Sequence, residues 1–480
     1  MRLKLLSLIV LAVAVVIVLV ACGGGGGNRS RSTGSGTGVI NTSVSDPATC
    51  AGPSGPFSHV IVTVARVRAH TSATAGDNDP GFVDLTPANM TPVQVDLLGT
   101  PTAQCFLAQL GTSVQIAAGT YQQVRIIVLD NAQTQSLANN QCGTGNGVNC
   151  VVLTSDGTTH QLNLSTEATT GIKLTAGQIS GGSFTVASGQ TANLNLNFNA
   201  CASVVADPSG QFRLKPVVRA DSIASTLNIT GRVVDSVTQG TIFGGKVIVA
   251  LEQRDSAGVD RVLMEITPDG GGNFVFCPVP GGTFDVVATA VNGANVAYAA
   301  TITTGVQAGA AMGNIPIVPQ PGTGSVASPA SINGTITTSN NGSTRPADVV
   351  LSALQPVTIG TTNTLVTVSL AAQGVTTLTL TTQASGCAVP TSACANYTLQ
   401  VPAANPNVGA FATTGTTYAQ DTVSAVNYTV EGQAFVPSSP ATPSCAPSIV
   451  SVNTLSGGGP LVVSGGAAVT AANLGFAGCQ

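Results

Sequence analysis

Short runs of alternating apolar and polar residues, separated by turn-forming residues, recur along most of the chain. The clearest is residues 193–198, NLNLNF, in which every second side chain is apolar. Residues 59–68 and 119–128 are rich in Val and Ile, which favour extended backbone. Because side chains of a strand alternate between its two faces, this spacing predicts strands with one buried face. The pattern predicts an all-β chain.

The first 22 residues indicate export. Arg2 and Lys4 precede an apolar run from Leu5 to Val20, and Cys22 follows. This is the order of a secretory signal peptide, predicted over residues 1–21. The ending LVAC resembles the lipobox of bacterial lipoproteins, which implies cleavage before Cys22 and lipidation of that cysteine. The alternative is an uncleaved membrane helix, because the run is close to the length needed to span a bilayer.

Five glycines follow Cys22, and the next residues are rich in Gly and Ser. Residues 22–44 are therefore predicted to be the lipidated cysteine and a flexible tether. Gly23 stands where lipoproteins retained at the inner membrane carry Asp, so the lipoprotein resemblance implies the outer membrane. We expect a lipoprotein of the bacterial cell envelope that is held at the membrane by its N-terminal lipid.

Cysteine usage agrees with export. Without Cys22 ten cysteines remain, and an even number in an exported chain favours disulfides over metal binding. Short spacing makes two pairs candidates for local disulfides, and a third pair would close the last region. The other pairings stay open, and Cys277 stands alone in the middle region. The candidate pairs are Cys142 with Cys150, Cys387 with Cys394, and Cys445 with Cys479.

The first large region, residues 45–222, carries an ordered set of motifs. HVIVTVARVRAH, VQVDLLG, AGTYQQVRIIV and LKPVVRA follow one another between residues 57 and 220. In this order they resemble the domain of unknown function 4382 family of bacterial lipoproteins. The resemblance implies a β-sandwich-like domain with no assigned reaction, so it provides no catalytic residues.

Residues 226–318 have a second set of motifs. NITGRVV is followed by GNFVF and by VPGGTFDVVA, which read as alternating strands around glycine turns. They resemble carboxypeptidase regulatory-like and Cna B-type domains, which implies a transthyretin-like β-sandwich. After a Pro- and Gly-rich linker at 319–329, residues 330–480 look like a degenerate repeat of this domain. The predicted fold is thus all-β, with two or three sandwich-like domains in tandem.

Motifs for catalysis are weak. None of the three histidines, His59, His70 and His160, begins an HExxH zinc motif, and no serine lies in a GxSxG elbow. Residues 240–246, GTIFGGK, match the start of a phosphate-binding loop, but Val247 stands where Ser or Thr is needed. A strand is also predicted to follow, whereas phosphate binding needs a helix N-terminus. We interpret this segment as a hairpin loop.

Two further segments have alternatives. Residues 77–81, DNDPG, could offer oxygens to Ca²⁺, but a solvated turn explains them better because the EF-hand spacing is absent. The Cna B resemblance implies, as an alternative, a Lys–Asn isopeptide bond near a Glu, with Lys246 and either Glu252 or Glu265 as the candidates, although the motif match is poor.

Composition limits the functions that remain. Charged residues make up 8% of the chain and its net charge is −4, which argues against nucleic acid as a partner. We expect no cofactor and no metal, and a non-enzymatic role in envelope structure, display or adhesion. The alternative is binding of carbohydrate or another ligand, with a glycan or an envelope protein as partner. The chain has no Trp, five Tyr and 13 Phe, mostly within predicted strands, so exposed rings for sugar stacking are not evident.

Overall fold

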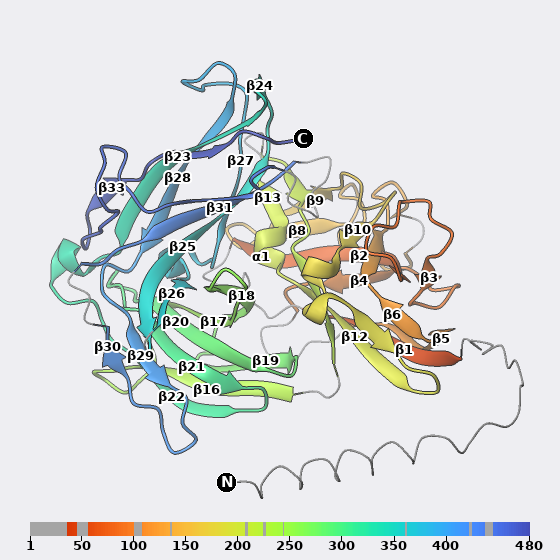
Figure 1. Cartoon of the computed structure of the whole chain (residues 1–480), viewed down its shortest axis with the longest axis horizontal. Helices are drawn as coiled ribbons and strands as arrows, with labels where there is room; N and C mark the ends of the chain where they lie inside the picture. Colours follow the sequence, from red (N-terminus) through yellow and green to blue (C-terminus); the bar gives the residue numbers. More distant parts are fainter. Residues whose placement is uncertain are drawn as a thin grey trace, which may run out of the picture. The chain divides into compact units, whose positions relative to one another are not determined.

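A computed structural model gives the structure of most of the chain. It describes residues 36–45, 56–99, 108–134, 137–206, 210–223, 227–242, 244–360, 362–421, 425–436 and 445–480. The predicted signal peptide and Cys22 lie outside these ranges. The described residues are almost entirely β, which confirms the predicted fold class (Figure 1). No helix in these ranges is long and apolar enough to cross a membrane.

The first module is built from the strands β1 to β15. Its larger sheet has the order β10-β7-β2-β8-β9-β14-β13, with β3 and β4 also paired to β2. Its smaller sheet has the order β15-β12-β1-β5, and β11 pairs with β6. The elements are β1 (Thr37–Ser45), β2 (Phe57–His70), β3 (Val83–Asp84), β4 (Val93–Asp96), β5 (Ala108–Ala117), β6 (Gly119–Tyr121), β7 (Gln123–Val128), β8 (Cys150–Leu153), β9 (Thr159–Asn163), β10 (Ile172–Leu174), η2 (Ala176–Gln178), η3 (Ser180–Gly182), β11 (Phe184–Val186), β12 (Thr191–Phe198), α1 (Ala200–Ser203), β13 (Val204–Ala206), β14 (Phe212–Leu214) and β15 (Val218–Ser222).

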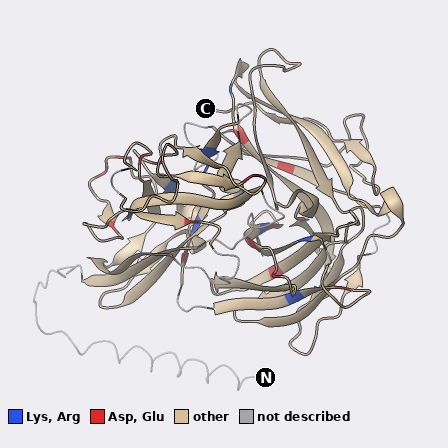
Figure 2. Cartoon of the chain, turned by 180° about the vertical axis from the view of Figure 1, so that it is seen from behind, with Lys and Arg blue, Asp and Glu red and all other residues tan. Residues whose placement is uncertain are grey.

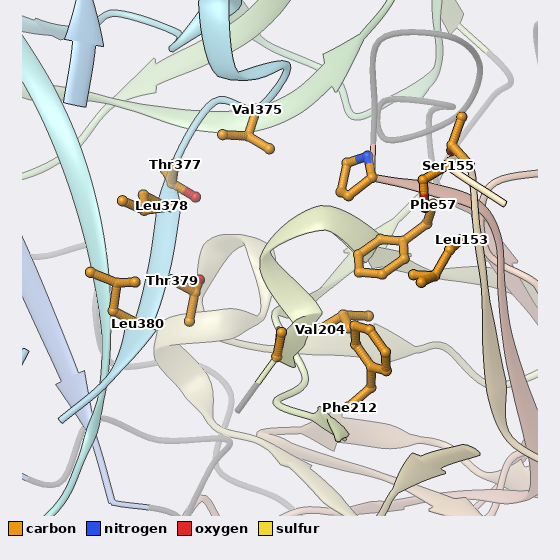
Figure 3. A pocket seen from close by; sticks show the side chains of 13 residues that line it. Phe57, Leu153, Ser155, Val204, Phe212, Val375, Thr377, Leu378, Thr379 and Leu380 are labelled. Atoms are coloured by element: carbon orange, nitrogen blue, oxygen red, sulfur yellow. The ribbon is translucent and has the colours of Figure 1, made fainter. Parts of the chain in front are cut away.

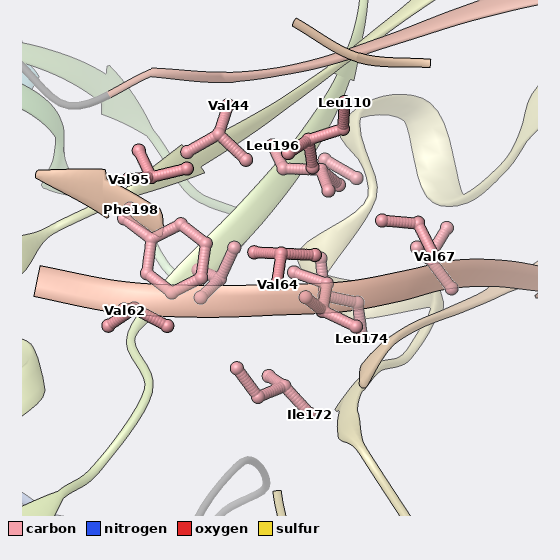
Figure 4. Close-up of a cluster of buried hydrophobic side chains, with 14 of the residues drawn as sticks. Val44, Val62, Val64, Val67, Val95, Leu110, Ile172, Leu174, Leu196 and Phe198 are labelled. Atoms are coloured by element: carbon pink, nitrogen blue, oxygen red, sulfur yellow. The ribbon is translucent and has the colours of Figure 1, made fainter. Parts of the chain in front are cut away.

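One apolar core joins the two sheets of this module. Val62 and Val64 of β2 are buried in the same cluster as Leu196 and Phe198 of β12 (Figure 4). Full burial of each such side chain stabilises the fold by about 1.5–3 kcal/mol. The apolar members of NLNLNF form one side of this core, as predicted. The opposite face is not solvated as expected, because Asn195 and Asn197 are buried too.

The first module begins earlier than expected. β1 pairs in parallel with β12 from Val39 to Ser45, and Ile40, Thr42 and Val44 are buried. The Thr42 hydroxyl also donates to the carbonyl of Leu85 (3.0 Å). The predicted tether at 22–44 therefore ends too late, and the predicted first module at 45–222 starts too late. The alternation begins inside the Gly- and Ser-rich segment, whose composition hides it.

The second and third modules follow along the chain. The second consists of β16 (Leu227–Asp235), β17 (Lys246–Arg254), β18 (Val259–Ile266), β19 (Asn273–Val279), β20 (Thr283–Val291), β21 (Thr301–Gln307) and β22 (Ala311–Ile317). η4 (Gly324–Ala327) leads to the third, which consists of β23 (Ala330–Asn340), β24 (Ser343–Thr344), β25 (Asp348–Ile359), β26 (Thr362–Thr367), η5 (Ala371–Gln373), β27 (Leu378–Thr381), β28 (Ala393–Val401), β29 (Asn407–Ala410), β30 (Ala419–Gln420), β31 (Thr429–Phe435), β32 (Ile449–Val452), β33 (Ala468–Thr470) and β34 (Leu474–Phe476).

These two modules share one pairing scheme. β16 pairs antiparallel with β19 and parallel with β22, and β23 pairs antiparallel with β28 and parallel with β33 and β34. β17 lies between two antiparallel neighbours, β18 and β20, and β25 likewise lies between β26 and β31. The segments that look repeated in the sequence therefore have equivalent pairing partners in the two modules.

A glycine opposite an aromatic ring marks the same place in both modules. Gly231 of β16 pairs with Phe274, and Gly334 of β23 pairs with Tyr397. A Cβ atom on either glycine would collide with the ring of its partner. The ring covers the glycine and fills the space that a side chain would take, which explains the glycine in the repeated I-x-G motif.

The second and third modules also share one sheet of 11 strands. Its order is β30-β29-β21-β20-β17-β18-β26-β25-β31-β32, with β27 paired to β25 (Figure 1). Two parallel pairings join the modules, β18 with β26 and β21 with β29. The predicted linker at 319–329 is also anchored, because the buried Gln320 side chain donates to the carbonyls of Val326 and Ser328. The two modules are therefore not separated by a free linker.

Candidate functional site

Charged side chains are sparse on the chain, as Figure 2 shows. Several of those that are buried lie where modules meet. Arg213 of β14 forms two parallel hydrogen bonds to the carboxylate of Asp348 at the start of β25, with distances of 2.7 and 2.6 Å. The Thr381 hydroxyl donates to the same carboxylate (2.7 Å), which is completely buried. Asp348 therefore binds the first module to two strands of the third.

Lys215 lies two residues beyond Arg213 and is also completely buried. Its Nζ is 3.8 Å from the centre of the Phe435 ring of β31, and among the described residues it has no hydrogen-bond partner. Burial lowers the pKa of this ammonium to about 7, and the charge of Arg213 acts in the same direction while Asp348 opposes both. The lysine is thus a poorly compensated cation between the first and third modules.

A second ion pair joins the second and third modules. Arg261 of β18 donates two hydrogen bonds to the carboxylate of Glu431 on β31, and its Nε donates to Asp255 (2.9 Å). The Ser451 hydroxyl donates to Glu431 as well (3.3 Å). These contacts lie beside the β18–β26 pairing and fix the neighbouring strands of the two modules.

Three carboxyl groups lie close together beside this junction of the second and third modules. They are Glu252 on β17, Asp260 on β18 and Asp285 on β20. Burial raises the pKa of Glu252 well above its usual value, and the neighbouring Asp260 and Asp285 raise it further. Burial also raises the pKa of Asp285 to about 7, against the opposing effect of a hydrogen bond from the Gly305 N–H. Glu252 accepts a hydrogen bond from the Thr367 N–H of β26 (3.2 Å).

This carboxyl cluster resembles an acid–base pair only in composition. Glu252 and Asp260 are completely buried, so a substrate has no access to them. No three His, Cys, Asp or Glu side chains in the described ranges are arranged so that they could hold a metal ion. The contacts of the cluster run from β17 and β18 to β26, because the Thr367 hydroxyl also donates to the Asp260 carbonyl (2.8 Å). We interpret it as part of the junction.

A mainly apolar cleft of about 670 Å³ opens between the first and third modules. Phe57 and Phe212 line one side with Leu153 and Val204, and strand β27 lines the other with Leu378 and Leu380 (Figure 3). The two phenylalanine rings are perpendicular, with centres 5.8 Å apart. They are only 6% and 8% exposed, so neither forms an open platform for a sugar ring.

The histidines all have local partners. His59 Nδ1 lies 2.7 Å from Asp96, His70 Nε2 lies 3.1 Å from Asp79, and His160 contacts the Thr158 hydroxyl (2.9 Å). His59 and His160 lie near one another across β8, opposite Val152 and Val151, whereas His70 is at the other end of β2, so the three rings do not form one site.

The candidate Ca²⁺ ligands at 77–81 and the candidate phosphate-loop and isopeptide residue Lys246 all contact other parts of the protein. In the predicted turn at 77–81, Asp77 pairs with Arg125 (2.7 Å) and Asp79 accepts from the Gly81 N–H (2.9 Å). Lys246 is the first residue of β17 rather than of a helix, and its Nζ donates to the Ala372 carbonyl (3.1 Å). Lys246 therefore contributes to the junction with the third module.

The structure contains disulfides at the three candidate pairs. Two of them close short segments, at sequence separations of 8 and 7, and the third closes a separation of 34. Cys277, the single cysteine of the middle region, is disulfide-bonded as well. The pairs are Cys142–Cys150, Cys387–Cys394 and Cys445–Cys479.

Comparison with known protein families gives a match for the first module. Residues 37–216 match the family described as "Domain of unknown function (DUF4382)". The match begins at the residue that opens β1, in agreement with the structural boundary. No curated protein matches the chain.

Solved structures give weak likenesses. The Bacillus anthracis TIE protein is similar at 10% identity and a TM-score of 0.16, over 92% of this chain and 51% of that one, so the chain spans about half its length. The shaft pilin SpaA from Lactobacillus rhamnosus GG has 12% identity and a TM-score of 0.17, over 60% of this chain and 99% of that one. A putative adhesin from Bacteroides ovatus has 9% identity and a TM-score of 0.16, over 44% and 78%. The family match covers residues 37–216, which is the first module apart from its last strand, β15.

Proposed function

We propose that this protein is an exported, non-enzymatic scaffold that presents three β modules as one rigid unit at a cell-envelope membrane. The observation that carries the proposal is the way the modules are joined. Independent tandem domains meet through exposed linkers and few contacts. Here one sheet continues from the second module into the third, and the buried Arg213–Asp348 pair ties the first module to the third.

The disulfides support the exported location, because such bonds persist in oxidising compartments. In this proposal Cys22 carries the lipid and the outer membrane is the destination. The second and third modules are two copies of one regulatory-like sandwich, and an envelope protein or a glycan is the partner that the scaffold presents or meets.

Calorimetry of the full chain with intact disulfides tests the rigid unit. If the modules form one cooperative body, they unfold in one transition whose calorimetric and van't Hoff enthalpies agree. Three separate transitions would contradict the proposal, since each module would then fold on its own.

Cell fractionation tests the membrane tether. Cys22→Ala should move the protein from the membrane fraction to the soluble extracytoplasmic fraction, because the lipid attachment site is lost. Ser30→Ala, a change in the same Gly- and Ser-rich segment, should leave the protein in the membrane fraction. Retention of the Cys22 variant in the membrane would favour the uncleaved helix.

Ligand binding is the second candidate function, and the cleft between the first and third modules favours it. The cleft is apolar and its two phenylalanine rings are largely covered. This chemistry fits an apolar ligand better than a carbohydrate, whose hydroxyl groups need many polar partners. A glycan array of the full chain is the direct test of the carbohydrate alternative, and a specific hit would overturn our preference for an apolar ligand.

A further inference from the structure

We propose that the cleft between β14 and β27 is a binding site for a neutral small molecule that has an apolar body and one or two hydrogen-bonding oxygens. The proposal goes beyond the scaffold function and does not depend on it. The volume of the cleft, about 670 Å³, lies within the range of roughly 300–1,000 Å³ that is usual for small-molecule pockets. A folded protein partner would need a far larger surface.

The side chains of the cleft define the chemistry of its occupant. Phe57 and Phe212 on one wall and Leu378 and Leu380 on the other are apolar, and among the described lining residues none is charged (Figure 3). A charged ligand would lose its hydration without gaining an ionic partner, which is strongly unfavourable. The cleft therefore selects neutral molecules.

Four residues with hydroxyl groups line the cleft, two on each wall: Thr154 and Ser155 of the first module, and Thr377 and Thr379 of the third. The hydroxyl oxygens of Thr154 and Thr379 are covered from solvent, so a ligand cannot reach them. Ser155 and Thr377 therefore provide the hydroxyl groups, one on each wall, to which a hydroxyl or carbonyl group on a ligand would bind.

The same ion pair holds both walls of the cleft. Phe212 precedes Arg213 on β14, and Thr381 ends β27; both Arg213 and Thr381 bind the carboxylate of Asp348. The distance between the two walls is therefore set by a buried interaction and not by the ligand. A preformed site loses less conformational entropy on binding, which favours affinity.

Fluorescence titration of the full chain with N-phenyl-1-naphthylamine tests the site. This neutral aromatic probe brightens in apolar surroundings, and we expect saturable binding of one molecule per chain. Ala206→Trp places a large ring at the exposed end of β13, which lines the cleft, and should weaken binding at least tenfold. Ala117→Trp, at an exposed residue of the same module outside the cleft, should change binding less than twofold.

Competition with 1-decanol and decanoate tests the ligand chemistry. Decanol should displace the probe, and decanoate should be at least tenfold weaker because its charge has no partner in the cleft. Thr377→Val, which keeps the shape of the side chain and removes the hydroxyl, should weaken decanol several-fold and leave the probe within twofold.

Three results would overturn the proposal. The first is the absence of saturable probe binding to the wild-type protein. The second is equal binding by the Ala206→Trp variant, provided that its thermal unfolding matches that of wild type, since the probe would then sit elsewhere. The third is displacement by decanoate as strong as by decanol, which would show that the site does not select neutral molecules.

Discussion

Replacing Lys215 by Met should stabilise the folded protein, and the gain should depend on pH. Lys215 is completely buried, and burial lowers the pKa of its ammonium from 10.5 to about 7. Each tenfold change in proton affinity corresponds to about 1.36 kcal/mol, so the protonated lysine costs the fold on the order of 4–5 kcal/mol. Methionine has a similar length and no charge, and exchanging a buried charge for an apolar side chain is often stabilising.

The direction of the pH dependence follows from the two states of the chain. The unfolded chain keeps this lysine protonated up to about pH 10.5, whereas the folded chain releases the proton near pH 7. The cost is therefore complete below pH 7 and disappears as the pH rises towards 10.5. The advantage of Lys215→Met over wild type should be largest at pH 6 and should shrink by about 1.4 kcal/mol per pH unit above pH 7.

Urea unfolding at pH 6, 7, 8 and 9, followed by circular dichroism, measures this difference. Subtracting the wild-type free energy at each pH removes the contributions of other titrating groups. Lys173→Met on β10, where the side chain is half-buried, is the matched control for exchanging a lysine for methionine. A difference between Lys215→Met and wild type that stays constant from pH 6 to pH 9 would refute the reasoning.

Three further predictions concern the junctions and the repeated modules. Asp285→Asn should be close to wild type in stability at pH 4 and more stable at pH 8. The pKa of the aspartate is raised to about 7 in the folded protein, so the wild type loses stability as the pH rises from about 4 to 7. Urea unfolding of both proteins at pH 4 and pH 8 measures the difference. Arg213→Met leaves Asp348 buried without its cation and should cost about 3–5 kcal/mol in unfolding free energy, with a lower Tm in calorimetry. Gly334→Ala should cost about 1–3 kcal/mol by the same calorimetric measurement, because its Cβ collides with an aromatic ring, whereas Gly119→Ala, in open space, should cost little.

The sequence predicted most of the strands, because alternation is a local signal. The run at 193–198 became β12, and the repeated I-x-G motif became the first strand of both the second and the third module. The same signal failed at β1, where glycine and serine hide the alternation of Ile40, Thr42 and Val44. The overall Gly and Ser content of this segment indicates a flexible tether, whereas the burial of a strand depends only on every second residue.

The junctions and the cleft could not be predicted in the same way. Arg213 and Asp348 are 135 residues apart, and nothing near either residue indicates its partner. The cleft combines Phe57, Phe212 and Leu378 from two modules, and each of these residues looks like an ordinary core position in its own strand. Such a site exists only through the relative placement of strands, which depends on long-range contacts that no local pattern encodes.

The low charge of the chain gives its few buried charges a specific role. Charged residues are only 8% of the sequence, yet Arg213, Arg261, Asp348 and Glu431 pair across modules where their desolvation is expensive. Apolar strands could slide along one another by two residues and still bury the same faces. A bidentate ion pair cannot, because a shift would leave a buried carboxylate without a partner. We therefore infer that these pairs select one arrangement of the modules more than they add to its stability, and that the geometry of the cleft follows from that selection.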